Sequence, residues 1–140
     1  MKKTLFILVF CINFFSCTTK TLDAKSLSKL NGYWEIQTVK LTDGTKKDYK
    51  VNETIDYFEI NNNKGFRQKV MPQFNGKYAT NGLKESIFIT TSDDVFFINY
   101  ITDYGKWKEE IVELQDSVLV LKSAENTEYH YKRQVPFSIK

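Results

Sequence analysis

Short runs of alternating apolar and polar residues, interrupted by turn-forming residues about every ten positions, fill the sequence from Leu30 onward. Alternation with a period of two places every second side chain on the same face of a strand. No segment in this region keeps the helical period of a long amphipathic helix. The pattern therefore predicts an all-β domain, either a sandwich or a barrel.

The individual runs predict eight or nine strands joined by short turns. We expect these strands at residues 34–39, 58–60, 66–70, 76–80, 86–91, 95–101, 106–114, 118–121 and 128–133. Asn81-Gly82 predicts a hairpin after one run, and Asp93-Asp94 predicts a turn after the next. Short turns make neighbouring strands antiparallel, and closure of such a meander hides its edges. We therefore predict an antiparallel up-and-down β-barrel.

The first 17 residues have the features of an export signal. Lys2 and Lys3 precede an apolar stretch of roughly 11 residues, which is shorter than the ~20 that a helix needs to cross a bilayer. This pattern predicts a signal peptide over residues 1–16. Ser16-Cys17 resembles the end of the bacterial lipobox, which implies that Cys17 is lipidated. The alternative is a secreted protein cut near Ser16, with Cys17 as a free or intermolecular thiol.

Cleavage before Cys17 leaves 124 of the 140 residues, a suitable size for one domain. We expect a lipid-anchored linker at residues 17–29, a barrel domain at residues 30–134 and a C-terminal tail at residues 135–140. No cysteine follows Cys17, so no disulfide is expected to stabilise the barrel.

Ser26 lies near the end of the predicted linker, just before two leucines. We expect its side chain to cap a single helical turn that carries Leu27 and Leu30. Such a turn would pack at the mouth of the barrel that follows.

The net charge argues against a nucleic-acid partner. Without Lys2 and Lys3 the chain has 18 basic and 17 acidic residues, so its net charge is about +1, whereas nucleic-acid binding requires a strong basic patch. Acyl chains on Cys17 would instead hold the protein on a membrane surface. We therefore expect a membrane-anchored lipoprotein of the cell envelope, at the outer membrane, facing either the periplasm or the outside.

Three short motifs lie in the predicted barrel: Gly32-x-Trp34, Gly76-x-Tyr78 and Tyr129-x-Tyr131-x-Arg133. Together with the strand meander they resemble the lipocalins, in particular short bacterial lipocalin-like lipoproteins, over residues 30–133. The resemblance implies that Trp34 closes one end of the barrel and that Arg133 lies across its indole ring. Gly32 would allow the tight bend there.

The resemblance also implies that the barrel carries a small apolar molecule, such as a lipid or fatty acid. By alternation we expect the following side chains to point inward and line the ligand site: Ile36, Phe58, Ile60, Ile87, Ile89, Phe97, Tyr129 and Tyr131. The alternative is that these side chains fill the core, because eight strands enclose little space. The protein would then be a protein-interaction module of the envelope. In either case we expect a monomer.

The sequence offers little support for catalysis, for a metal site or for a cofactor. His130 is the single histidine, and it alternates with two tyrosines on its strand, so we expect it to face outward. The paired acids Asp93-Asp94 and Glu109-Glu110 are adjacent, and adjacent residues on a strand point to opposite faces. We therefore predict no catalytic residues, no metal ligands and no cofactor.

A small outer-membrane barrel would also have about eight strands in a short chain. Such a barrel needs an apolar outer face, but charged residues such as Glu35, Arg67 and Lys106 interrupt the predicted strands. We therefore expect a barrel outside the bilayer, with only the N-terminus anchored.

Overall fold

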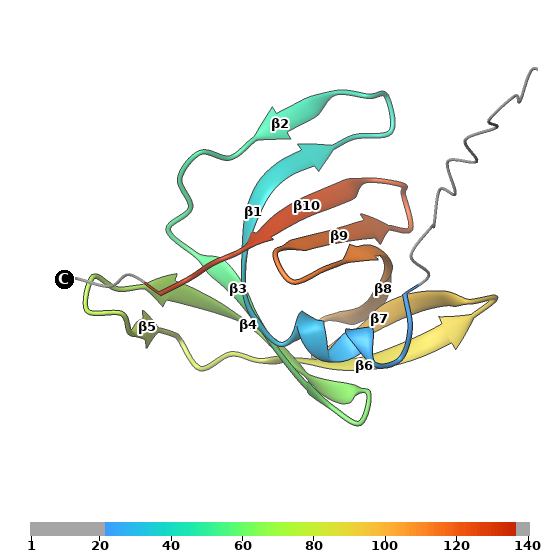
Figure 1. Cartoon of the computed structure of the whole chain (residues 1–140), viewed down its shortest axis with the longest axis horizontal. Coiled ribbons are helices and arrows are strands. Elements are labelled where there is room, and N and C mark those ends of the chain that lie inside the picture. The colour runs from blue at the N-terminus through green and yellow to red at the C-terminus, as the bar shows by residue number, and fades with distance from the viewer. Residues whose placement is uncertain (1–21, 137–140) are drawn as a thin grey trace, which may run out of the picture.

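The computed structural model describes residues 22–136, which form one 3-10 helix and ten β-strands (Figure 1). In chain order the elements are η1 (Ser26–Leu30), β1 (Gly32–Lys40), β2 (Lys46–Asp48), β3 (Ile55–Asn61), β4 (Lys64–Pro72), β5 (Tyr78–Ala79), β6 (Glu85–Ser92), β7 (Val95–Thr102), β8 (Gly105–Leu114), β9 (Val118–Ser123) and β10 (Glu128–Arg133). The predicted signal peptide and Cys17 lie outside the described residues. Within the described range, no helix has the length and apolar character needed to span a membrane.

Eight of the described strands, namely β1, β3, β4 and β6 to β10, close into an antiparallel barrel. Its closing pair is formed by the first and last strands, which run side by side from Trp34 opposite Arg133 to Lys40 opposite Glu128 (Figure 1). The two remaining strands, β2 and β5, pair with β1 and β4 respectively. The prediction of an all-β, up-and-down barrel is therefore confirmed.

Two of the hairpins turn at residues that the sequence marks clearly. Asn62 and Asn63 between β3 and β4 have φ angles of 49° and 62°, and Asp93 and Asp94 between β6 and β7 have 50° and 62°. Two successive residues with positive φ are the signature of a type I′ hairpin turn. Asn and Asp tolerate this conformation better than other side chains do.

The wall of the barrel opens beside the second half of β1. Only Gly32 to Trp34 pair with β3, whereas Thr38 to Lys40 pair with β2. The loop that follows β2 covers the opening, and Asn52 in this loop donates hydrogen bonds of 3.0 Å to Glu35 Oε1 and to the Ile36 carbonyl. The sequence did not predict β2, because Lys46 and Lys47 look like part of a solvated loop.

The hairpin predicted at Asn81-Gly82 is wrong. β5 instead pairs back onto the end of β4, and residues 80–84 connect it to β6 without strand structure. Contacts with distant residues hold β5 in place: the Tyr78 ring stacks on Tyr33 at 3.8 Å, and its hydroxyl donates to Gln134 Oε1 at 2.5 Å. These contacts lie far away in the sequence, so the local turn signal could not reveal them.

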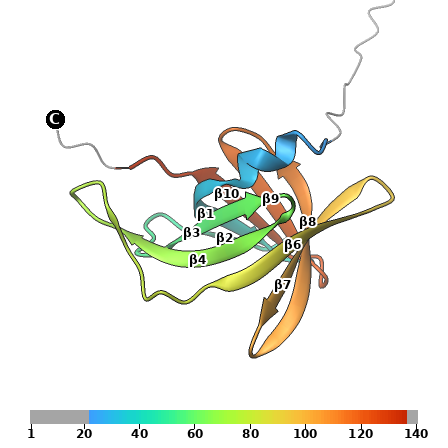
Figure 2. The same ribbon diagram turned by 90° about the horizontal axis from the view of Figure 1, so that it is seen from below.

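η1 lies over the end of the barrel where β1 begins, against β3 and β8 (Figure 2). Its Leu27 and Leu30 are buried, with 3% and 0% exposure. The predicted helical turn is thus present as a 3-10 helix, but Ser26 does not cap it; the Ser26 amide instead donates to Asp23 Oδ1 at 2.8 Å. Leu27, which the predicted boundary assigns to the linker, belongs to the core.

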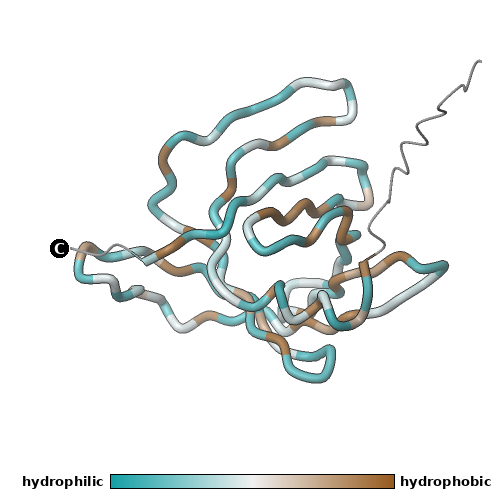
Figure 3. The backbone as a smooth tube through the Cα atoms, viewed as in Figure 1, coloured by the Kyte–Doolittle hydropathy of each residue, from teal (hydrophilic) through white to brown (hydrophobic). Residues whose placement is uncertain are grey.

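The core fills the barrel from η1 inward. The largest fully buried side chains are Trp34, Tyr100, Phe58, Leu30, Ile98, Leu119 and Leu121. β9 contributes two of them, and it is coloured as hydrophobic along most of its length in Figure 3. Burial of apolar surface contributes roughly 25 cal/mol per Å² to stability, so this packed interior is the main source of stability.

Candidate ligand-binding site

The end of the barrel beneath η1 is closed by Trp34. Its indole ring is fully buried, and its Nε1 donates a hydrogen bond of 2.8 Å to the Leu30 carbonyl. The Arg133 guanidinium covers the ring, with its central carbon 4.1 Å from the ring centroid. Positive charge over an indole face is attracted by the ring quadrupole. The structure thus brings together the two residues that the resemblance pairs.

Arg133 is held by backbone carbonyls as well as by the indole. Its Nη1 donates to the Asn31 carbonyl at 2.8 Å, and its other nitrogens donate to the carbonyls of Lys29 and Asp116. Gly32 has a φ of +119°, and a Cβ there would lie 2.6 Å from Arg133 Nη1. Only glycine therefore fits at this position, and the closed end has a structural role.

The interior contains charged side chains that the sequence interpretation did not expect. Arg67, Asp56 and Glu109 point inward. The Arg67 side chain is 13% exposed, and the residues Asp56 and Glu109 are 3% and 8% exposed. Arg67 Nε donates to Glu85 Oε2 at 2.5 Å and lies 4.0 Å from Asp56 Oδ1. Burying a charged side chain is costly unless it is paired. The Arg67 guanidinium is paired with carboxylates and also contacts an aromatic ring.

A stack of aromatic rings covers the Arg67 side chain. The Arg67 guanidinium lies 4.5 Å from the Tyr100 ring centroid, and the Trp107 ring stacks on Tyr100 at 4.9 Å. The Tyr100 hydroxyl donates to Glu109 Oε2 at 2.6 Å. Burial raises the pKa of the Glu109 carboxyl, although the Tyr100 hydrogen bond and Arg67 oppose that shift.

A cavity of about 220 Å³ lies at the opposite end from η1, where the wall between β1 and β3 opens. We call it the open-end cavity. Its lining comes from β1, β3, β4, β10 and the loop after β2: Ile36, Val39, Tyr49, Thr54, Ile55, Asp56, Lys69, Tyr129 and Tyr131. The lining therefore combines aliphatic groups, three tyrosine rings and one pair of opposite charges.

Asp56 connects the open-end cavity to the charged interior. Lys69 Nζ forms an ion pair with Asp56 Oδ1 at 2.7 Å. The side chain of Lys69 is 58% exposed, so it reaches the carboxylate from the solvent side. The buried carboxylate in the cavity wall is thus paired with a cation that is open to solvent.

Comparison with protein families gives a match to the lipocalin-like domain over residues 30–121. The chain belongs to the lipocalin-like domain family. The matched region runs from Leu30, two residues before the Gly32-x-Trp34 motif, into β9, and barrels of this family are a ligand-binding type of fold. Comparison with curated protein sequences finds no significant match.

Two solved structures from Bacteroides species are similar to this chain. A lipocalin-like protein from Bacteroides uniformis ATCC 8492 has a TM-score of 0.50 and 17% identity, and the match covers 76% of this chain and 99% of that one. An uncharacterized protein from Bacteroides eggerthii DSM 20697 has a TM-score of 0.49 and 16% identity, with 75% and 99% coverage. At 17% identity the first of these supports the lipocalin-like barrel and nothing more specific.

The predicted lining residues fall into three groups in the lipocalin-like barrel. Phe58, Ile87 and Ile89 are buried in the core, and Ile60 packs against it. Ile36, Tyr129 and Tyr131 line the open-end cavity. The structure therefore brings only these three together at a site with free space.

Phe97 is a correction, because it points out of the barrel. Its neighbour Phe96 packs against the core, in phase with Ile98 and Tyr100, while the Phe97 ring lies 4.6 Å from Lys108 Nζ. Two adjacent phenylalanines satisfy a period of two in either phase, so the sequence did not decide between them.

The inward charges of the lipocalin-like barrel could have been found from alternation alone. Asp56 lies in phase with Phe58 on β3, and Glu109 lies in phase with Ile111 on β8. Neither residue was predicted to face inward, because charged side chains are usually exposed. The alternation along each strand indicated an inward position, whereas the charged residue type indicated an exposed one.

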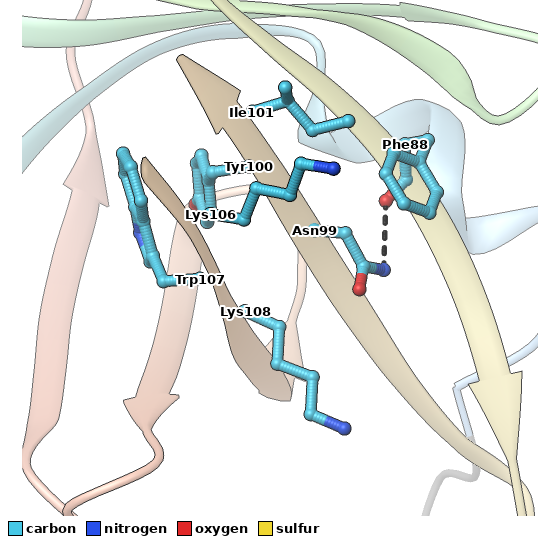
Figure 4. A pocket seen from close by; sticks show the side chains of 7 residues that line it. All are labelled: Phe88, Asn99, Tyr100, Ile101, Lys106, Trp107 and Lys108. Carbon is cyan, nitrogen blue, oxygen red and sulfur yellow. Dashed lines mark hydrogen bonds between the residues drawn. The ribbon is translucent and has the colours of Figure 1, made fainter. Parts of the chain in front are cut away.

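A second hollow lies on the outer surface across β6, β7 and β8, with a volume of about 310 Å³. Figure 4 shows Phe88, Asn99, Ile101, Lys106 and Lys108 on one side of these strands, with the Tyr100–Trp107 pair on the other. The Asn99 amide donates to the Phe88 carbonyl at 3.2 Å. We call this surface the outer hollow.

His130 is half-buried, and its Nε2 lies 3.0 Å from Glu128 Oε2 on the same strand. Within residues 22–136, no three His, Cys, Asp or Glu side chains gather closely enough to hold a metal ion. The contact of His130 is thus with a neighbouring side chain of its own strand.

Proposed function

We propose that this protein is a lipid-anchored lipocalin-like protein of the cell envelope that binds a small, largely apolar molecule at the open end of its barrel. The observation that carries this proposal is the open-end cavity. It lies opposite the closed end and is lined by Ile36, Val39 and Ile55 together with tyrosine rings. Ligand sites are concave and mostly apolar, with a few polar groups that fix orientation.

The size of the cavity limits the ligand. Its volume of about 220 Å³ is below the ~300 Å³ at which pockets begin to hold drug-sized molecules. The rest of the interior is filled by side chains such as Phe58 and Leu121, which are fully buried. The ligand is therefore small, or only its end enters the barrel and the remainder stays outside.

With lipid chains on Cys17, the position of η1 would orient the barrel on a membrane. The chain enters the described fold at the closed end, and Cys17 is five residues before Leu22. Five extended residues span at most about 18 Å, so lipid chains on Cys17 would hold the closed end close to the bilayer. The open-end cavity would then face away from the membrane, where it can receive a molecule from solution.

A fluorescence titration tests the binding function. We propose to add the neutral apolar probe N-phenyl-1-naphthylamine to the purified protein and to two variants. Val39→Trp fills the cavity with a larger side chain, and Val135→Trp adds the same group at a site that is 75% exposed. Saturable binding that is lost only in Val39→Trp supports the proposal, and the absence of saturable binding to the unmodified protein contradicts it.

The outer hollow favours a second function, that of a protein-interaction module. Ile101 remains 39% exposed there, beside Phe88, and aromatic groups are common at the centres of interfaces. An envelope protein that binds specifically should lose its affinity for Ile101→Glu and keep it for Val39→Trp. The opposite result would exclude this surface as the interface.

A further inference from the structure

Asp56 is a buried carboxylate at the wall of the open-end cavity. It is 3% exposed, and its Oδ1 forms an ion pair of 2.7 Å with Lys69 Nζ. A buried carboxylate needs a cation or a donor as its partner. A ligand that brings an ammonium group into the cavity would offer Asp56 such a partner in place of Lys69.

Two cations, Arg67 and Lys69, lie near Asp56. Arg67 is already engaged by Glu85 and by the Tyr100 ring, and its Nε lies 4.0 Å from Asp56. The cation nearest to Asp56 is Lys69, at 2.7 Å. With Glu109 included, this cluster has three carboxyl groups against two cations.

Lys69 is a partner that can be displaced. Its side chain is 58% exposed, and a lysine ammonium is a mobile point charge on a flexible stem. It occupies the mouth of the cavity, where an incoming ammonium group would meet the same carboxylate. The contact with Lys69 in the free protein therefore indicates that Asp56 can pair with an ammonium group.

Tyrosine rings form much of the remaining lining. Tyr49, Tyr129 and Tyr131 approach the cavity from the loop after β2 and from β10. Aromatic faces attract organic cations, and the attraction is strongest where water is excluded. Burial first, and then Asp56 and Glu109, raise the pKa of Tyr131 well above its usual value, while Arg67 opposes that shift.

We propose that the open-end cavity binds the ammonium group of a small organic amine, with Asp56 as its counter-ion and the three tyrosine rings around its apolar part. This inference rests on the proposed function and adds the chemical class of the ligand. Lys69 moves out to solvent when the amine enters. The cavity volume of about 220 Å³ restricts the enclosed part to a ring or a short aliphatic group.

Three probes of equal size separate charge from shape. Benzylammonium, benzyl alcohol and benzoate share a phenyl ring and are respectively cationic, neutral and anionic near neutral pH. Each is titrated into the isotopically labelled protein while the backbone amides of Asp56, Lys69 and Tyr131 are followed by NMR. Benzylammonium is expected to bind at least about tenfold more tightly than benzoate, which corresponds to about 1.4 kcal/mol.

Variants of the two charged residues sharpen the test. Asp56→Asn keeps the shape of the side chain, and it should remove the preference for benzylammonium over benzyl alcohol. Lys69→Met removes the competing cation, and it should tighten the binding of benzylammonium several-fold. Glu59→Gln is the control, because Glu59 lies on the same strand but is exposed and bonds the Tyr57 hydroxyl; it should change none of the three affinities.

The outcomes distinguish this inference from the proposed function. Equal binding of benzylammonium and benzyl alcohol would overturn the cation preference and leave an apolar site. Tightest binding of benzoate would also overturn it, since Lys69 would then be the anchor. If none of the three binds but N-phenyl-1-naphthylamine does, only the amine inference fails, and if neither binds, both fail. Should Asp56→Asn not fold, the ranking in the unmodified protein and in Lys69→Met decides.

Discussion

Arg133, at the end of the last strand, covers the buried indole of Trp34 at the start of the first strand, with 4.1 Å between the guanidinium carbon and the ring centroid. The two residues also face each other across the β1–β10 pairing that closes the barrel. One contact therefore joins the first and last strands and seals one end of the barrel. The open-end cavity lies at the other end.

Replacing Arg133 by Ala should destabilise the protein by about 2 kcal/mol or more, because the contact with the indole and the hydrogen bonds to three carbonyls are lost together. The free energy of unfolding is measured in urea. Lys132→Ala is the control, since the Lys132 side chain is 54% exposed and forms an ion pair with Glu35. Equal stability of the two variants would show that Arg133 does not seal the barrel.

Gly32→Ala should lower the free energy of unfolding by more than about 1 kcal/mol. The added Cβ would lie 2.6 Å from Arg133 Nη1, and the φ of +119° disfavours any side chain. Gly105→Ala is the matched control, because no heavy atom lies within 4 Å of its ideal Cβ. Urea unfolding measures the free energy of unfolding of both variants, and Gly32→Ala should be the less stable one. Equal stability of the two variants would contradict the close packing at Gly32.

These closed-end residues were predictable because a short motif and the period of the strands agree there. The turns at Asn62-Asn63 and Asp93-Asp94 were predictable for a similar reason, since their backbone conformation depends on the turn residues themselves. β5 was not predictable, because Tyr33 and Gln134 hold Tyr78 from distant parts of the chain.

The candidate site was predictable only in part. Alternation correctly places Ile36, Tyr129 and Tyr131 on the inner face, but it cannot say which inward side chains border free space. Asp56 and Lys69 were missed, because a charged residue on a barrel strand is more often exposed. Their contact depends on the pairing of β3 with β4, which places Asp56 opposite Lys69.

Glu109 should make stability fall as the pH rises. Burial raises the pKa of its carboxyl above the usual value of 4.5, so the stability it contributes is complete below that value and is lost as pH rises through the raised pKa. Glu109→Gln keeps an acceptor for the Tyr100 hydroxyl and cannot ionise. Relative to the unmodified protein, this variant should gain stability between about pH 4 and about pH 7.

Urea unfolding at the two pH values measures this effect. Glu125→Gln serves as the control, because Glu125 is exposed in the turn between β9 and β10. If Glu109→Gln differs from the unmodified protein by the same amount at both pH values, then Glu109 does not titrate with a raised pKa in the folded protein.

Cys17→Ser should release the protein from the membrane fraction, because the residue that would carry the lipid chains is removed while the barrel is unchanged. Fractionation of cells that produce each version measures the distribution, and incorporation of labelled palmitate detects the lipid directly. Quantitative recovery of Cys17→Ser in the membrane fraction would contradict lipid anchoring through this residue.

The most direct test of ligand binding at the open end is an NMR titration of the labelled protein with N-phenyl-1-naphthylamine. We predict that the amides that shift most belong to Ile36, Val39, Tyr129 and Tyr131, which line the open-end cavity. Shifts centred on Phe88, Asn99 and Ile101 in the outer hollow, or no saturable shifts at all, would contradict a binding site inside the barrel.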